Sequence, residues 1–283
     1  MNLGCGKMNV DFHMHTNNSD GAYSYDKLIS ECLKNDVRYL AITDHNAFSC
    51  YHDIPKGIKT INGMELDVRY NKYVFHMLLY HFNENSELLK EYFKRSRRHE
   101  IYRFHKYIDL IEETYHFNID KKFIREFIKN NNYFDTVRVN KLLVLYHICN
   151  NPKEAFIKYT HILPPNKRYR IKMDYFKKIA SDSNGIMSLA HPLHYKLSME
   201  QMKKIIIELK DKYHLQVVEA INNHQTKKEE KELIDFCKKN NLLISGGSDA
   251  HYAFGEKSNK RVGYVLDDKI NVEDITFLKL LNK

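Results

Sequence analysis

The apolar and polar positions along the chain follow two alternating periods, which predict a series of strands and helices. Short runs rich in β-branched and aromatic residues, bounded by polar or glycine positions, indicate strands. Such runs lie at residues 8–15, 37–43, 59–68, 72–82, 185–190, 215–221 and 242–246. Apolar positions spaced three and four apart predict helices at residues 24–35, 199–213 and 227–240. Strands and helices that alternate at these lengths are typical of βαβ units and of a mostly parallel sheet or barrel.

The middle of the chain has a different pattern. Between residues 84 and 175 the sequence reads as several charged amphipathic helices, for example at residues 86–113 and 121–130, with few strand signals. Tyr70-Asn71, between the third and fourth strand runs, is typical of a hairpin turn. We therefore predict an α/β fold in one domain over residues 1–283, with a helical insertion at about residues 84–175.

Composition narrows the classes of function. A single α/β barrel of about 250 residues would use most of the 283-residue chain. The formal net charge of +9 favours anionic partners such as phosphates, nucleotides or nucleic acid, although scattered surface lysines would give the same sum. The five cysteines form no CxxC pair, which argues against a thiolate zinc site and fits a reducing cytosol. No apolar run approaches the roughly 18 residues that span a bilayer, so we expect a soluble, cytoplasmic protein.

Metal-binding residue types recur at or near the strand ends. The set consists of His13, His15, Asp20, His45, Glu65, His76, His191, Asp249 and His251. The carboxyl ends of strands in an α/β barrel converge on one mouth. Residues two apart on a strand share a face, so His13 and His15 can share one ion, and Asp249 and His251 repeat that spacing. Imidazole with carboxylate and no thiolate suits Zn²⁺, Fe²⁺ or Mn²⁺. Because the groups are too many for one ion, the sequence predicts two or three divalent metals with a bridging carboxylate.

The ordered series of motifs resembles one known family. VDFHMHTNNSDG, LAITDHN, NGMELDV, FHMLLYH, SLAHPLHY and GGSDAH are similar to the motifs of the PHP (polymerase and histidinol phosphatase) family, and they span residues 10 to 251. The resemblance implies a distorted (β/α)7 barrel with a trinuclear metal centre. It implies that the first metal is held by His13, His15, Glu65 and Asp249. Glu65 would bridge to a second metal held by His76 and His191, and the third would be held by Asp20, His45 and His251.

Two features resemble the nucleotide phosphoesterase branch of that family. They are Asp20 in the HTxxSDG motif and the helical stretch between His76 and His191. The branch includes enzymes acting on nucleoside monophosphates or 3′,5′-bisphosphates and a ribonuclease that trims short RNA 5′ ends. Its threonine-arginine-any-histidine motif matches Val137-Arg138-Val139-Asn140 here, which keeps the arginine and has asparagine for the histidine. His194 in AHPLHY stands where the branch often has arginine. The substrate implied is a small phosphorylated molecule, a nucleotide or short RNA.

The resemblance also implies a mechanism. A hydroxide bridging two metals would be the nucleophile, because metal coordination lowers the pKa of water toward neutrality. Arg138 is the first candidate for binding the phosphate, since a guanidinium binds phosphate through parallel hydrogen bonds. Arg97 and Arg98, in the cluster KRSRRHE, are further candidates. His194 could bind phosphate or protonate the leaving oxygen.

Four other functions stay open from the sequence. A histidinol-phosphate phosphatase would share the metal centre, but Asp20 and the helical stretch weigh against it. A nuclease on polymeric RNA or DNA is weakly favoured by the positive charge, although no basic stripe is recognisable. A metal-stabilised binding module would predict missing ligands or a fused polymerase. An amidohydrolase-like enzyme on a non-phosphate substrate would also begin with HxH, but its usual carboxylated lysine is not identifiable.

Overall fold

Two main sheets carry the strands in the computed structural model, which describes residues 8–47, 51–165, 167–252 and 260–281. The smaller sheet is parallel and contains, in spatial order, β1 (Asn9–Asp11), β2 (Val37–Leu40) and β3 (Lys59–Thr60). The larger one contains, in spatial order, β6 (Arg170–Lys172), β4 (Gly63–Tyr70), β5 (Tyr73–Tyr80), β7 (Ile186–Leu189), β8 (Val217–Ile221) and β9 (Leu243–Gly246). A separate short hairpin joins β10 (Tyr264–Val265) to β11 (Asp268–Lys269).

Backbone hydrogen bonds connect the two sheets at two places. The amide of Phe12, just after β1, donates to the carbonyl of Gly246 in β9 at 3.1 Å. The amide of Glu65 in β4 donates to the carbonyl of Asp44, after β2, at 3.2 Å. With these links the two sheets have the arrangement of a distorted (β/α) barrel, as predicted, but in the described part of the chain they remain separate sheets and the barrel is not closed. The predicted hairpin is also present, because β4 and β5 are antiparallel and place Tyr70 opposite Tyr73.

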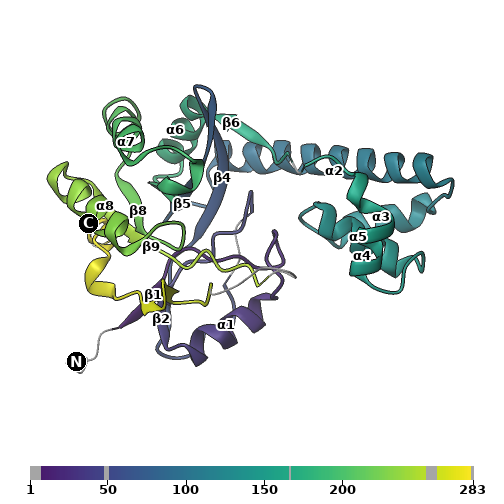
Figure 1. Ribbon diagram of the computed structural model, residues 1–283, viewed down its shortest axis with the longest axis horizontal. Helices are drawn as coiled ribbons and strands as arrows, with labels where there is room; N and C mark the ends of the chain where they lie inside the picture. Colours follow the sequence, from purple (N-terminus) through teal and green to yellow (C-terminus); the bar gives the residue numbers. More distant parts are fainter. Residues whose placement is uncertain (1–7, 48–50, 166, 253–259, 282–283) are drawn as a thin grey trace.

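Helices cover the outside of the barrel. Figure 1 shows α1 (Tyr25–Lys34) beside β1 and β2, and α6 (Met173–Asp182), α7 (Met199–Tyr213) and α8 (Lys227–Lys239) on the outer side of the larger sheet. Short 3-10 turns are η2 (Pro192–Tyr195), η3 (Val272–Asp274) and η4 (Phe277–Leu280). Ser24, Ser198 and Thr226 cap α1, α7 and α8, since each side chain accepts a backbone N–H of the first turn. Apolar residues of the larger sheet and of α6, α7 and α8 pack into one large core, and those of α1 and β2 form a second, smaller cluster.

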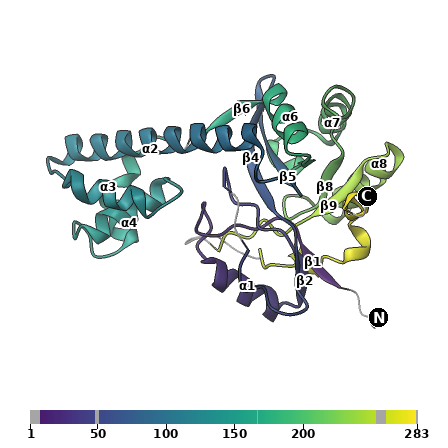
Figure 2. The same cartoon turned by 180° about the vertical axis from the view of Figure 1, so that it is seen from behind.

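The helical insertion projects from the barrel. Its elements, here called the helical arm, are α2 (Glu87–Tyr115), α3 (Lys121–Lys129), α4 (Thr136–Leu145), α5 (Pro152–Lys158) and η1 (Thr160–Ile162). In Figures 1 and 2, α2 runs away from the barrel and the shorter helices lie along its outer part. The arm has a hydrophobic core of its own, which includes Phe104, Ile108, Val139 and Leu142. Among the described residues, no helix is long and apolar enough to cross a membrane.

The chain returns to the sheet earlier than the helical pattern indicates. Residues 170–172 form β6, which pairs in parallel with β4 and places Arg170 opposite Asp67, and α6 begins at Met173. These positions fall inside the range expected to be helical, up to residue 175. A strand of three residues is too short to give a clear alternating pattern, and its pairing with β4 depends on contacts distant in the sequence.

The arm core generates a stability prediction. Phe104 is fully buried, with its ring centroid 5.6 Å from that of Phe127 and 4.9 Å from that of Phe134. Replacing it in Phe104→Ala should lower the free energy of unfolding by about 3–5 kcal/mol, because it leaves a cavity among these rings. The measurement is urea unfolding followed by circular dichroism. Tyr102→Ala is the matched control, since Tyr102 is exposed on the same helix. Equal stabilities of the two variants would contradict a packed arm core.

Candidate metal centre

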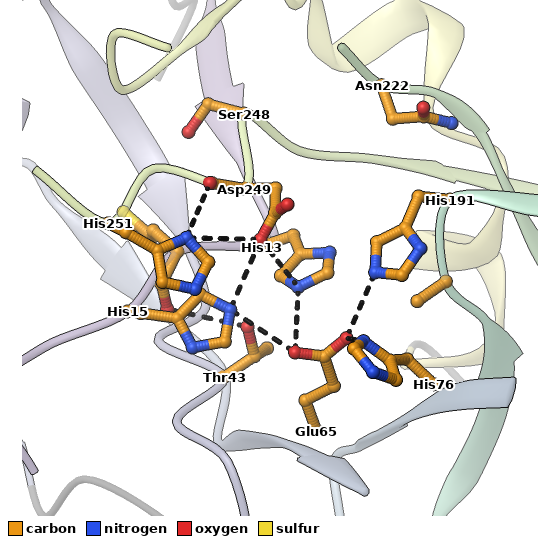
Figure 3. Close-up of polar contacts among 12 residues, drawn as sticks. His13, His15, Thr43, Glu65, His76, His191, Asn222, Ser248, Asp249 and His251 are labelled. Atoms are coloured by element: carbon orange, nitrogen blue, oxygen red, sulfur yellow. Dashed lines mark hydrogen bonds and ion pairs between the residues drawn. The ribbon is translucent and has the colours of Figure 1, made fainter. Parts of the chain in front are cut away.

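The carboxylate of Glu65 lies at the centre of a buried cluster of imidazoles. Glu65 is on β4 and only 1% exposed. Its Oε2 lies 3.4 Å from His13 Nε2, 3.3 Å from His15 Nε2 and 3.2 Å from His45 Nε2. Figure 3 shows His13 and His15 facing one side of this carboxylate. The first strand, the second strand and the hairpin thus bring their ligand candidates to one point.

Two further imidazoles face the other oxygen of the same carboxylate. Glu65 Oε1 lies 2.8 Å from His76 Nδ1 and 3.1 Å from His191 Nε2. His76 comes from β5 and His191 follows β7. Figure 3 shows these two rings together on the side of Glu65 opposite to His13 and His15. A carboxylate placed between two sets of imidazoles has the arrangement needed to bridge two ions.

Two aspartates complete the cluster. Asp249 Oδ1 lies 3.4 Å from His13 Nε2 and 3.3 Å from His15 Nε2. Asp20 Oδ1 lies 3.2 Å from His251 Nε2, and its Oδ2 lies 3.5 Å from His45 Nε2. All nine residues singled out in the sequence therefore meet at one mouth of the barrel.

Buried polar contacts hold the backbone at the first ligands. The Asp11 carboxylate accepts backbone N–H groups from His13 at 3.1 Å, Ser248 at 3.0 Å and Gly263 at 2.7 Å. These bonds turn the chain out of β1 after Asp11, so the predicted strand at residues 8–15 ends early. Gly247 allows the close approach, because a Cβ there would lie 2.2 Å from the Cβ of His13. The two segments that carry these ligand candidates, near opposite ends of the chain, are thus fixed to each other.

The loop that carries Asp20 is held by Asp44. The Asp44 carboxylate accepts the Thr16 N–H at 2.8 Å and the hydroxyls of Thr16 and Ser19 at 2.6 Å each. His191 and Asp249 adopt positive φ values of 26° and 53°. Positive φ is uncommon for residues other than glycine and occurs in turns as well as at functional sites.

The distances fit bound cations. Ligand atoms about 2.1 Å from an ion in a tetrahedral arrangement are about 3.4 Å apart, which is the spacing seen around Glu65 Oε2 and Asp249 Oδ1. His13 Nε2, His15 Nε2 and Asp20 Oδ1 are buried and have no hydrogen-bond partner among the described residues. Three overlapping groups have ligand atoms within 4.8 Å of one another: His15, Asp20, His45 and His251; His13, His15 and Glu65; His45, Glu65 and His76. The residues therefore fit divalent ions.

The electrostatics of the cluster lead to the same conclusion. Burial acts to raise the pKa of Glu65, but the facing imidazoles, His45 first, hold that pKa well below its usual range. Burial acts to lower the pKa of His15, yet Asp249, Glu65 and Asp20 raise it to about 10. In the absence of a cation the carboxylates therefore draw protons onto His13 and His15, whereas burial lowers the pKa of His45 and of His191. A divalent ion would take the place of these protons and leave the imidazoles neutral as ligands.

The substrate-binding candidates occupy different surroundings. Arg138, on α4, is buried and its Nη2 donates to the backbone carbonyls of Asn17 and Ser19, so it holds the loop that carries Asp20. Arg97 donates to the carbonyls of Asn131 and Ile128 in the arm.

The other two candidates are exposed. Arg98 lies on the surface of α2. His194 is next to the cluster, with its Nδ1 3.1 Å from His224 Nδ1. Partial burial and the neighbouring imidazoles lower the pKa of His194 to about 4, so it is neutral at pH 7.

Arg168 is a candidate site residue that the sequence interpretation missed. Its Nε donates to Asp67 Oδ1 at 2.9 Å, its Nη1 to Asp20 Oδ2 at 3.1 Å, and its Nη2 lies 3.0 Å from His76 Nε2. It lies in the run NKRYRIK, where nothing in the spacing distinguishes it from its basic neighbours.

Other missed residues support Asp249 and His13. His224 Nε2 and Lys260 Nζ lie 3.1 and 2.8 Å from Asp249 Oδ2. Glu219 Oε1 lies 2.8 Å from His13 Nδ1, and its Oε2 accepts the His191 N–H at 2.7 Å. Glu219 could have been noticed in the sequence, because it is a lone carboxylate in the apolar strand VVEAI.

Removing a ligand candidate should remove metal. His13→Ala or Asp249→Ala should lower the bound metal by at least about one ion per chain and reduce activity by about a thousandfold or more. Metal is counted by inductively coupled plasma mass spectrometry on the same sample that is assayed. His105→Ala is the matched control, because His105 is exposed on α2. Full metal content and activity in both ligand variants would contradict the assignment.

Glu219 should affect the affinity for metal without being a metal ligand. Glu219→Gln keeps the shape of the side chain but weakens its hold on His13 Nδ1, because a neutral amide oxygen is a poorer acceptor than a carboxylate. The dissociation constant for Mn²⁺, measured by competition with a chelator, should rise about 10- to 100-fold. An unchanged constant would show that this contact does not support the site.

Comparison with known proteins agrees with the geometry. The PHP domain family model matches residues 11–244. A 5′-3′ exoribonuclease of Haemophilus influenzae is 22% identical over 87% of this chain and 90% of its own length. The 5′-3′ exoribonuclease Rnm of Escherichia coli is 22% identical over 85% of this chain and 84% of its own. A structure from Bifidobacterium adolescentis, described as a metal-dependent phosphoesterase, shares the fold with a TM-score of 0.70 at 18% identity, over 96% of this chain and 95% of that one. The chain therefore belongs to the PHP family and is a metal-dependent phosphoesterase, a hydrolase that acts on phosphate ester bonds.

Proposed function

We propose that the enzyme hydrolyses phosphate monoesters of nucleotides, such as nucleoside monophosphates or 3′,5′-bisphosphates. The observation that carries this proposal is the position of Arg168. Its guanidinium lies beside His76 and Asp20, at the edge of the cluster centred on Glu65. A fixed cation next to bound divalent ions is suited to a doubly charged terminal phosphate.

We assign the ligands as follows. Glu65, His13, His15 and Asp249 would hold one ion, and Glu65, His76 and His191 would hold a second. Asp20, His45 and His251 would hold a third. Support comes from the two sets of imidazoles on opposite oxygens of Glu65 and from the short distances between Asp20 and the imidazoles of His45 and His251. Imidazole and carboxylate donors suit Zn²⁺, Mn²⁺ or Fe²⁺.

The bound ions would supply a water made acidic enough to attack at neutral pH and would neutralise charge on the phosphate oxygens. The protein would orient the ester. Arg168 has five N–H donors, and Asp67 and Asp20 accept one each from its Nε and Nη1. Donors that remain on Nη1 and Nη2 can donate to phosphate oxygens, while Asp67 and Asp20 keep the guanidinium in place. Such a pre-oriented cation needs little reorganisation when charge develops on the phosphate.

Short RNA is the second candidate substrate. It is favoured by the two relatives named as 5′-3′ exoribonucleases, which align over most of this chain. Both candidates require hydrolysis of a phosphate ester at the same cluster. They differ in whether the substrate continues beyond one nucleotide.

A substrate panel separates these possibilities. The Mn²⁺-loaded protein is assayed for phosphate release from AMP, 3′-phosphoadenosine 5′-phosphate, histidinol phosphate and p-nitrophenyl phosphate, and for nucleotide release from a short 5′-phosphorylated RNA. We expect the highest kcat/KM on one of the two free nucleotides. A preference for the RNA would select the second candidate. A preference for histidinol phosphate would contradict the proposal.

Arg168 gives a second test. Arg168→Ala should lower kcat/KM for the best substrate by about 10- to 1,000-fold, and Arg168→Lys should restore part of that loss, because lysine keeps the charge but not the fork of donors. Bound metal is measured in parallel. Arg125→Ala is the control, since Arg125 is exposed on α3. If Arg168→Ala keeps the full rate, Arg168 does not bind the phosphate.

A further inference from the structure

A cavity lies between the metal centre and the base of the helical arm. It has a volume of about 210 Å³ and is lined by His45 and Asn46 from the barrel, Phe93, Ser96 and Glu100 from α2, and Tyr133. His45 belongs to both the cavity and the metal cluster, so the two are adjacent. The volume is below the roughly 300–1,000 Å³ typical of sites for drug-sized ligands, so it suits one small ring.

Two residues that line the cavity each have a buried polar atom without a partner. These atoms are Asn46 Nδ2 and Glu100 Oε1, which have no hydrogen-bond partner among the described residues, although Asn46 is only 8% and Glu100 only 2% exposed. The other end of each side chain is engaged. The Tyr92 hydroxyl donates to Asn46 Oδ1, and Arg103 donates to Glu100 Oε2. These contacts leave a fixed donor on Asn46 and a fixed acceptor on Glu100.

A ligand that fits an unpaired donor and an unpaired acceptor must supply one hydrogen-bond acceptor and one hydrogen-bond donor. Buried polar groups are normally satisfied, and unsatisfied ones often mark a place for a bound molecule. Burial raises the pKa of Glu100 to about 7, and Arg103 and a backbone hydrogen bond from Tyr169 oppose this effect. The edge of a nucleobase presents a donor beside an acceptor. Its faces can stack on aromatic rings such as those of Phe93 and Tyr133.

We propose that this cavity is a nucleobase subsite, in which Asn46 and Glu100 read the polar edge of the base while its phosphate is bound at the metal cluster. The inference rests on the proposed nucleotide substrate and deepens it. It also gives the helical arm a function, because Phe93 and Glu100 belong to α2. The barrel would supply the reaction chemistry, and the arm would supply the preference for a base.

The test compares substrates that differ only in the base. Ribose 5-phosphate carries the sugar and the phosphate of a nucleoside 5′-monophosphate but has no base. At pH 8, where Glu100 is ionised, the wild-type enzyme should show a kcat/KM at least about tenfold higher for its preferred nucleoside monophosphate than for ribose 5-phosphate. Glu100→Gln replaces the acceptor oxygen with an amide and should reduce that ratio by about tenfold or more. An effect on folding or metal binding would lower both rates together and leave the ratio unchanged.

A matched variant controls for the loss of one negative charge on α2. Glu113 is exposed on the same helix, 13 residues further along and so about 20 Å from Glu100. Glu113→Gln should leave the ratio unchanged. Binding of the free nucleoside, which has no phosphate, is measured by saturation-transfer NMR on wild type and Glu100→Gln. We expect binding by the wild type and at least about tenfold weaker binding by the variant.

The outcomes distinguish the subsite from the proposed substrate. If nucleotides are hydrolysed but ribose 5-phosphate is hydrolysed as well, and Glu100→Gln leaves the ratio unchanged, the subsite is wrong and the nucleotide phosphatase stands. If no nucleotide is hydrolysed but the nucleoside binds in a way that depends on Glu100, the proposed reaction is wrong and the subsite stands. If no nucleoside binds to the wild type, the subsite is overturned.

Discussion

The structure depends on the buried carboxylate of Glu65 and the imidazoles that surround it. Moving a charged group out of water costs several kcal/mol unless opposite charge and hydrogen bonds compensate. Glu65 Oε2 faces His13, His15 and His45, and Glu65 Oε1 faces His76 and His191. Neutral imidazoles alone would not balance the carboxylates, so the cluster needs positive charge, either as protons on His13 and His15 or as bound cations.

Much of the neighbouring structure serves to hold these groups in place. Asp11 and Gly247 fix the ends of the first and last strands against each other. Glu219 holds both the ring of His13 and the backbone of His191. These residues lie in strands or at strand ends, where the backbone is rigid, so the ligand candidates are positioned before any ion arrives. Such preorganisation lowers the free-energy cost of binding several ions close together.

The helical arm is linked to the barrel at the metal centre. Arg138, from α4 of the arm, holds the backbone of the loop that carries Asp20. Arg168, between the arm and β6, contacts the Asp20 side chain directly. The cavity beside His45 is lined from both sides. The arm therefore lies where it can contact the substrate. Its own hydrophobic core stabilises it separately from the core of the barrel.

The sequence predicts the α/β fold and the grouping of the ligand candidates, because both leave local patterns; that these residues bind metal stays a prediction. Strand and helix periods repeat along the chain, and metal-binding side chains must follow particular strands. Arg168 could not be found in this way, because its role depends on Asp67 and Asp20, which lie about 100 and 148 residues away in the sequence. The role of Arg138 could not be predicted from the sequence either, because it depends on contacts between α4 and the loop at residues 17–19. The short strand β6 forms because it pairs with β4, and its own three residues give no strand pattern that could be recognised in the sequence.

The position of bound metal tests the central claim most directly. Crystals of the protein grown with Mn²⁺ would be measured at a wavelength where manganese scatters anomalously. We predict one anomalous peak on each side of the Glu65 carboxylate, one within about 2.0–2.3 Å of His13 Nε2 and His15 Nε2 and the other near His76 and His191. Well-ordered side chains with no anomalous peak at Glu65, in protein saturated with Mn²⁺, would contradict it.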